Sequence, residues 1–251
     1  MLRDMNQLRD APPFGVTAVE GLLTVEAMLQ EALRYVPYCS EHRCVWSSHF
    51  ARIILDAASQ VDSIWKATAK IIAPATASDK LTLKDHFDRF GTLVARQQVV
   101  FFSGESPCTI SPFNGWRDSG FSSPAWWDAY NRLKHDRFSN QTEATLDHAV
   151  NAAAALLLAI IYSGSCDLAL ISAALLDPSS SNPWAFTNTG LLRDVTFDCQ
   201  AKLETKLFAH PLGVCGVDDC NLSNYWRSAS SRFNAWWALS ADRFTRPRGG
   251  S

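Results

Sequence analysis

The sequence has no excess of basic residues, and this limits how it can contact a nucleic acid. It carries 23 lysines and arginines against 25 aspartates and glutamates, which gives a formal net charge of −2. A domain that binds nucleic acid over a broad surface is expected to be strongly basic. The composition therefore argues against a general nucleic-acid binder, and only a local basic patch could contact a phosphate backbone.

The chain also lacks the apolar segments that direct a protein into or across a membrane. The first residues, MLRDMNQLRDAPP, carry charges where the apolar part of a secretory signal would begin. The most apolar stretch, 152–162, is shorter than the roughly 20 residues that a spanning helix needs. We therefore expect a soluble, cytoplasmic protein with no membrane partner, in which 152–162 is a buried central helix.

Paired cysteine motifs are absent as well. The cysteines lie at positions 39, 44, 108, 166, 199, 215 and 220, with no CxxC pair among them. An odd number of scattered cysteines indicates buried free thiols in a reducing compartment. Cysteine and histidine do come close together in two segments, 39–49 and 210–220. Neither segment has the paired spacing of a structural zinc site, so we expect no metal.

Motifs that bind nucleotides or activate a serine are missing too. The sequence contains no G-x-G-x-x-G or Walker pattern and no G-x-S-x-G nucleophile turn. It also shows no internal repeat. No cofactor is expected from these absences, and any catalytic group has to be found elsewhere.

What the sequence does contain is helical periodicity. Apolar residues recur at spacings of three and four over 16–35, over 45–73 (from Trp46 to Ile71) and over 221–244. Thr82 and Asp85 predict a capping box for a further helix, and other helices are predicted over 124–138, 142–162 and 167–176. Segments 97–102 and 195–209 are compatible with strand or helix. The predicted fold class is all-α, or mainly α, with at most a minor β element.

The connections suggest how this fold is divided. Segment 103–123 is rich in serine, proline and glycine, and loops of that length in compact domains are often functional. We expect an N-terminal helix and connection (1–44), a helical core (45–176) and an aromatic-rich C-terminal extension packed on the core (177–251). The aromatic residues of 221–244 could alternatively form a surface for a protein partner.

Segment 124–138, PAWWDAYNRLKHDRF, concentrates polar and aromatic residues. On a helix at 100° per residue its side chains separate onto three sides. The first carries Asp128, Arg132 and Asp136 as i,i+4 opposite charges, which is typical of a solvated face. The second carries Trp126, Ala129, Tyr130, Leu133 and Arg137. The third carries Trp127, Asn131, Lys134, His135 and Phe138.

The third side is unusual because it groups an amide, an ammonium and an imidazole between two aromatic rings. A core would accept Asn131, Lys134 and His135 only if each had a partner, since an unsatisfied buried polar group costs about 1–3 kcal/mol. The cluster therefore either lines a pocket or forms a satisfied structural network.

The pattern WW-x-x-YN-x-x-KH-x-R in 126–137, followed by an Ala/Leu-rich helix, resembles uncharacterised bacterial proteins of the HEPN-like kind. The helix predicted over 45–73, with Ser47, Ser48, Asp56 and Asp62, is similar to the long first helix of that fold. The resemblance spans about 45–163. It implies an α-helical bundle, commonly a homodimer, and in many members a metal-independent ribonuclease of toxin–antitoxin and antiviral defence systems.

The resemblance also implies roles for the motif residues. His135 would act as general acid or base, Lys134 or Arg137 would stabilise phosphoryl charge, and Asn131 would orient the imidazole or the phosphate. The rings of the motif would stack on an unpaired base, and Arg132 would assist binding; these substrate-binding residues are Trp126, Trp127, Tyr130 and Arg132.

One feature departs from the family pattern. The HEPN signature places an arginine four to six residues before the histidine, whereas Arg132 precedes His135 by three. Two functions therefore stay open: an RNA-directed defence or toxin-type protein that acts as an endoribonuclease, and a non-catalytic HEPN-like binding or regulatory module.

Overall fold

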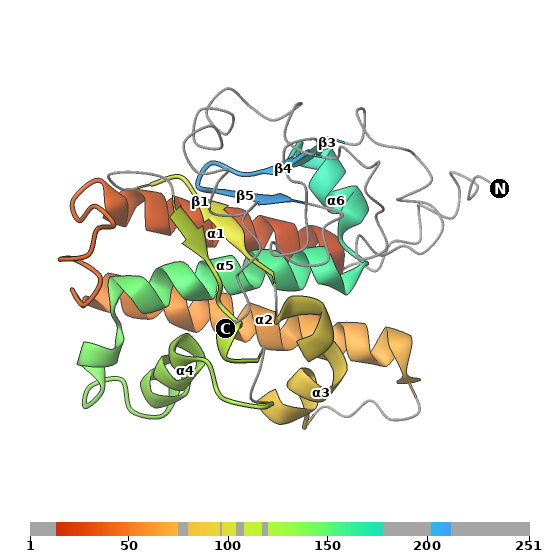
Figure 1. Cartoon of the computed structure of the whole chain (residues 1–251), viewed down its shortest axis with the longest axis horizontal. Helices are drawn as coiled ribbons and strands as arrows, with labels where there is room; N and C mark the ends of the chain where they lie inside the picture. The colour runs from red at the N-terminus through yellow and green to blue at the C-terminus, as the bar shows by residue number, and fades with distance from the viewer. Residues whose placement is uncertain are drawn as a thin grey trace, which may run out of the picture.

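Helices make up most of the part of the chain that the structure describes. The computed structural model describes residues 14–74, 80–95, 97–103, 108–116, 120–177 and 202–211. Its α-helices are α1 (Phe14–Leu33), α2 (Ser48–Ile72), α3 (Leu83–Val94), α4 (Ala125–His135), α5 (Leu146–Ser163) and α6 (Asp167–Ser172). Two 3₁₀ turns, η3 (Asn114–Trp116) and η4 (Gln141–Glu143), flank α4 in sequence. The mainly helical class is confirmed (Figure 1).

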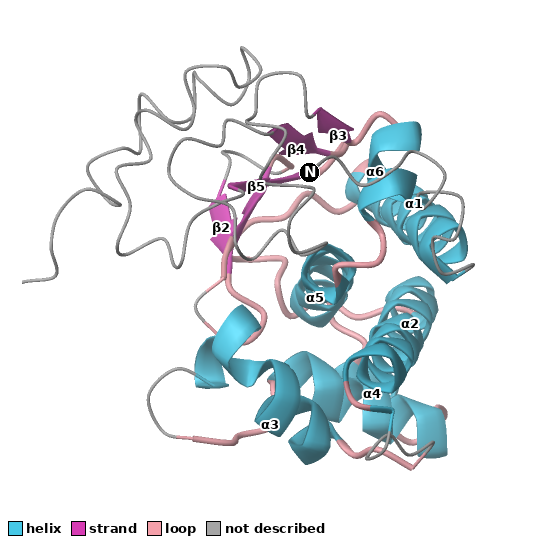
Figure 2. Ribbon diagram, turned by 90° about the vertical axis from the view of Figure 1, so that its right-hand side faces the viewer, coloured by secondary structure: helices cyan, strands magenta, loops and turns pink. Residues whose placement is uncertain are grey.

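Helix α5 lies at the centre of this arrangement. Figure 2 shows it nearly end-on, with α1 and α2 on one side and α3 and α4 below. By length and composition it is the one described helix apolar enough to cross a membrane, yet 83% of its residues are buried inside the fold. That burial confirms the prediction of a buried central helix at 152–162.

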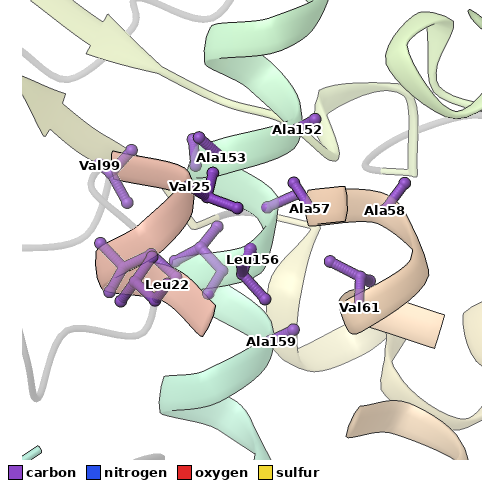
Figure 3. Close-up of a cluster of buried hydrophobic side chains, with 14 of the residues drawn as sticks. Leu22, Val25, Ala57, Ala58, Val61, Val99, Ala152, Ala153, Leu156 and Ala159 are labelled. Atoms are coloured by element: carbon purple, nitrogen blue, oxygen red, sulfur yellow. The ribbon is translucent and has the colours of Figure 1, made fainter. Parts of the chain in front are cut away.

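Small side chains let α2 approach α5 closely. Ala57 and Ala58 of α2, and Ala152 and Ala153 of α5, are all fully buried. Figure 3 shows them in one cluster with larger apolar side chains such as Leu22 of α1. Because alanine keeps two helix axes close without leaving a void, this part of the core has little room for larger residues.

Side-chain caps decide where three of the helices begin. The Ser47 and Thr145 hydroxyls accept hydrogen bonds from the backbone N–H groups of Phe50 (3.1 Å) and His148 (3.2 Å). Thr82 and Asp85 form the predicted capping box at the start of α3. Such caps stabilise a helix by about 1 kcal/mol each, because they satisfy N–H groups that have no partner within the helix.

A small antiparallel sheet packs over α1 and the C-terminal end of α5. Its strands are β1 (Val99–Phe101), β2 (Cys108–Ile110), β3 (Leu176–Asp177), β4 (Lys202–Glu204) and β5 (Phe208–Pro211), in the order β2-β1-β5-β4-β3. The carboxylate of Glu26 on α1 is buried and accepts hydrogen bonds from the Thr205 hydroxyl and from the Leu207 N–H (2.7 Å). The predicted minor β element is confirmed, and the ambiguous segment 97–102 forms β1.

Two predictions about the ends and connections of the helices were wrong. Segment 103–123 was predicted to be a loop, but it contains β2 and η3, and Phe113 and Trp116 are buried. The amphipathic face of 45–73 was drawn too long, since Trp46 and Ile71 lie outside the core and are about half exposed (48% and 53%). Helix α2 begins only at Ser48, so Trp46 belongs to the preceding connection.

Residues from all three predicted segments of the chain share one hydrophobic core. Helix α1, from the predicted N-terminal segment, and β4 and β5, from the predicted extension, contribute to the same hydrophobic cluster as α2 and α5. The helix predicted over 221–244 lies outside the described residues.

A buried histidine joins the sheet to the central helix. His210 on β5 is fully buried; its Nδ1–H donates to the Gln98 carbonyl (2.7 Å), and the Tyr162 hydroxyl donates to its Nε2 (3.2 Å). Burial lowers the pKa of His210 from 6.5 to about 4, against the smaller opposing effect of the Gln98 hydrogen bond. The imidazole is therefore neutral in the folded protein at neutral pH.

Acid is expected to lower the free energy of unfolding through His210. Because the pKa of His210 is lower in the folded protein, its contribution to stability is complete above pH 6.5 and falls as the pH drops toward 4, by about 3 kcal/mol. Asp167 acts in the opposite sense, since burial raises its pKa from 3.8 to about 7 and so favours the folded state in acid. The contribution of Asp167 is present in both the parent and a His210→Gln variant, so it cancels when the two proteins are compared. The stability difference between parent and variant, measured by urea unfolding, should shrink by about 3 kcal/mol between pH 8 and pH 4; a difference independent of pH would contradict the assignment.

Candidate functional site

Helix α4 carries the motif, and its ends differ from those predicted. Pro124 occupies the N-cap position, while the hydroxyl of Ser123 donates to the Asp128 carboxylate (2.5 Å). The helix ends at His135, because Asp136 leaves the helical conformation with φ −151° and ψ 89°. Arg137 and Phe138 therefore lie in the turn after α4 and do not continue its faces.

The motif's three aromatic rings belong to the core. Trp126, Trp127 and Tyr130 are only 2%, 6% and 5% exposed. The Trp126 indole N–H donates to the Pro112 carbonyl (2.9 Å), and its ring packs edge-on against Trp127 with centroids 5.5 Å apart. A base could not stack on rings buried to this degree, so the structure corrects the substrate-binding role expected for them.

Arg132 is engaged in an ion pair. Its guanidinium contacts the Glu143 carboxylate of η4. The i,i+4 pairs expected with Asp128 and Asp136 do not form: Asp128 accepts from Ser123, and Asp136 accepts from the Ser139 N–H (3.1 Å). Arg132 thus ties α4 to η4, and a role in binding substrate would require this pair to open.

Asn131, Lys134 and His135 remain together on the solvent side of α4. Lys134 and His135 are exposed and Asn131 is half-buried. The Lys134 ammonium lies over the Tyr130 ring, 5.4 Å from its centroid. Within the described residues, His135 forms no hydrogen bond or ion pair, and Asn131 does not orient it. The cluster is therefore an open polar surface at the end of a helix, neither a pocket lining nor a buried network.

Arg137 is the motif residue that does meet a pocket. Its Nη2 donates to the Ser48 carbonyl at the start of α2 (3.0 Å). Beside this contact lies a cavity of about 290 Å³ between the first turn of α2, the end of α4 and η4. It is lined by Ser47, Ser48, Ala51, Leu133, Arg137, Phe138, Gln141 and Ala144.

His135 and this cavity lie on different sides of α4. Leu133 faces the cavity, and His135 follows it by two residues, which corresponds to about 200° around a helix. The imidazole and the cavity are thus separated by about the width of a helix, roughly 10 Å. A flexible ligand that crosses the C-terminal end of α4 could contact both.

Positive charge gathers around this end of α4. Lys134 is exposed, and Arg52 is exposed one helical turn after Ser48, whose carbonyl holds Arg137. In the described part of the chain, none of Arg52, Lys134 and Arg137 forms an ion pair with an acidic side chain. Asp136 is the exposed carboxylate within the turn. The result is a local basic patch on a protein whose net charge is close to zero.

Comparisons with known proteins give no relative from which a role for these residues could be taken. The chain matches no protein-family model, no curated protein and no solved structure. The HEPN-like resemblance consequently rests on the motif and its setting.

A second polar cluster, between α2 and α3, has a structural role. His86 is fully buried, and its Nε2 lies 2.9 Å from the Asp62 carboxylate, which also accepts from Lys66 (2.6 Å). Burial raises the pKa of Asp62, but the hydrogen bonds from His86 and Lys66 outweigh this effect and hold it below its usual value. The Nδ1 of His86 is buried without a partner among the described residues, and the His86 ring packs against the rings of Trp65 and Phe90.

The thiols and the metal-capable segments give no metal site in the described residues. No group of three potential ligands occurs there, and Cys215 and Cys220 lie outside the described part. Cys166 is buried, Cys39 and Cys108 are half-buried and Cys44 is exposed, so the expectation of buried thiols holds among the described cysteines for Cys166 and is wrong for Cys44. All four described cysteines are free thiols.

Proposed function

We propose that this protein is an RNA-directed, HEPN-like protein of the bacterial defence or toxin type, which contacts RNA with the C-terminal end of α4 and cleaves it without a metal. The observation that carries the proposal is the open end of α4, where His135 and Lys134 are exposed on one side and a cavity bordered by Arg137 lies on the other. The mainly helical fold is compatible with a HEPN-like bundle. A cytoplasmic location and a homodimer are part of the proposal and follow from the resemblance.

The chemistry needs only groups that this surface offers. As a general acid or base, His135 can take the proton of a ribose 2′-hydroxyl or donate one to the leaving oxygen. The O2′ then forms a bond to the adjacent phosphorus while the bond to the 5′-oxygen breaks. The products are a 2′,3′-cyclic phosphate and a 5′-hydroxyl. Lys134, or Arg137 across the helix end, would stabilise the charge that develops on the phosphoryl oxygens.

The test is RNA cleavage by the parent protein in EDTA, with the product ends identified by mass spectrometry. We expect 2′,3′-cyclic phosphate ends, which require attack by the 2′-hydroxyl. An RNA in which every ribose is 2′-O-methylated should remain intact under the same conditions. Cleavage that persists on the methylated RNA would contradict the proposed chemistry.

The second candidate is a non-catalytic HEPN-like binding or regulatory module. It is favoured by the lack of any orienting partner for His135 in the described residues and by the engagement of Arg132 with Glu143. A cation at a helix C-terminus also stabilises the helix, which would account for Lys134 without catalysis. RNA that is bound by the protein but left intact in EDTA would establish this candidate in place of the first.

A further inference from the structure

The cavity beside Arg137 has the size and walls of a small-molecule subsite. Its volume of about 290 Å³ is just below the roughly 300–1,000 Å³ found for ligand sites. Leu133, Ala51 and Ala144, each at most 2% exposed, line its buried side, Phe138 is its exposed apolar wall, and Ser47, Gln141 and Arg137 place polar groups around it. An apolar slot with a few polar groups suits a flat heteroaromatic ring better than it suits a bare ion.

Arg137 is positioned to hold an anion at the edge of this slot. Its hydrogen bond to the Ser48 carbonyl uses one of the N–H groups of the guanidinium and fixes its direction. The remaining N–H groups can bind a phosphate. The same edge is formed by the first turn of α2, a helix of 25 residues, whose N-terminal dipole also favours negative charge.

Phe138 gives the slot an aromatic wall that is open to solvent. It lines the cavity, yet it is 87% exposed, the most exposed of the large apolar side chains in the described residues. An exposed phenyl ring beside a basic side chain is the combination that single-stranded nucleic-acid sites use, with a base on the ring and a phosphate on the cation.

We propose that the cavity between α2, α4 and η4 binds one unpaired nucleobase of an RNA strand, stacked against Phe138, with a neighbouring phosphate on Arg137. This inference rests on the proposed function, which supplies RNA as the ligand, and it names the subsite that selects unpaired RNA. The strand then crosses the C-terminal end of α4 toward His135 on the other side. A double helix, whose bases are paired and stacked, could not place a base in the slot.

The test compares binding of a base with binding of the backbone alone. The probes are a short fluorescein-labelled 2′-O-methyl oligouridylate, which cannot be cleaved through its 2′-oxygen, and an abasic strand with the same number of phosphates. We expect the parent to bind the base-bearing strand at least about tenfold more tightly in fluorescence anisotropy, the size expected for one stacked base.

Variants locate the effect. Ser48→Phe should fill the slot without removing the backbone carbonyl that holds Arg137, and Phe138→Ala removes the stacking ring; each should abolish the preference for the base-bearing strand. Phe138→Trp should retain it. Phe121→Ala is the matched control, because Phe121 is also exposed (39%) but packs beside Phe87 of α3. Arg137→Ala should weaken both probes alike, since it removes a phosphate contact.

The outcomes separate this inference from the proposed function. Equal binding of the two probes by the parent, or a preference that survives in both Ser48→Phe and Phe138→Ala, overturns the base subsite while RNA cleavage can stand. A preference lost in those two variants supports the subsite even if the parent leaves natural RNA intact, in which case only the cleavage proposal fails. Binding of neither probe overturns the subsite.

Discussion

Replacing His135 with alanine is expected to slow metal-free RNA cleavage by about 10²–10⁴-fold, the usual contribution of a general acid or base. The side chain is exposed at the end of α4 and has no partner in the described residues. Its removal should therefore leave the free energy of unfolding within about 0.5 kcal/mol of the parent value. A large loss of rate without loss of stability is the signature of a side chain that acts on substrate.

Two control variants make this result specific. His42→Ala removes another partly exposed histidine, in the connection before α2, and should cleave at the parental rate. Lys134→Ala should retain the proton-transfer group but lose charge stabilisation, so its rate should fall less steeply with added salt than that of the parent. A His135→Ala protein that cleaves RNA as fast as the parent would remove His135 from the mechanism.

Trp126→Ala is expected to lower the free energy of unfolding by about 3–5 kcal/mol, the range found when a buried tryptophan or phenylalanine is truncated. The Trp126 ring is only 2% exposed and contacts Phe113, with centroids 5.8 Å apart. The change would also leave the Pro112 carbonyl without the indole N–H that it accepts. Urea unfolding monitored by far-UV circular dichroism measures the difference.

Trp46→Ala is the matched control for this experiment. Trp46 is 48% exposed, and its backbone pairs with Thr145, so alanine should cost much less than at position 126. A Trp126→Ala protein with parental stability and a selective loss of RNA binding would restore the stacking role that the structure removes.

Much of the helical framework was predictable because helix caps and apolar runs depend on residues that are close in sequence. Thr82 and Asp85 lie three residues apart and form the capping box that their spacing predicts. The apolar run of 152–162 forms most of α5. The β element was harder to place, because β1 pairs with β5 across more than 100 residues, as Val100 does with Ala209. No local pattern records a pairing over that separation.

The candidate site was only partly predictable, for reasons that lie in its geometry. The prediction took 124–138 as one helix and therefore placed Phe138 beside His135, whereas α4 ends at His135. Helical spacing within 124–138 also cannot show that Glu143 of η4, rather than Asp128, pairs with Arg132. Ser47 and Ser48 meet Arg137 only through the packing of α2 on α4, about 90 residues apart in sequence. The Ser47 hydroxyl, which caps α2, is a local feature that marks the first turn of α2.

The most direct test of RNA binding at the C-terminal end of α4 is to map where RNA touches the protein. A single-stranded RNA that contains 4-thiouridine would be crosslinked to the full-length parent protein by long-wavelength light, and the modified peptides identified by mass spectrometry. We expect crosslinks within 134–141, with Phe138 as the principal site, and their loss in Ser48→Phe. Crosslinks confined to other parts of the chain, or an unchanged pattern in Ser48→Phe, would contradict the claim that the C-terminal end of α4 is the RNA site.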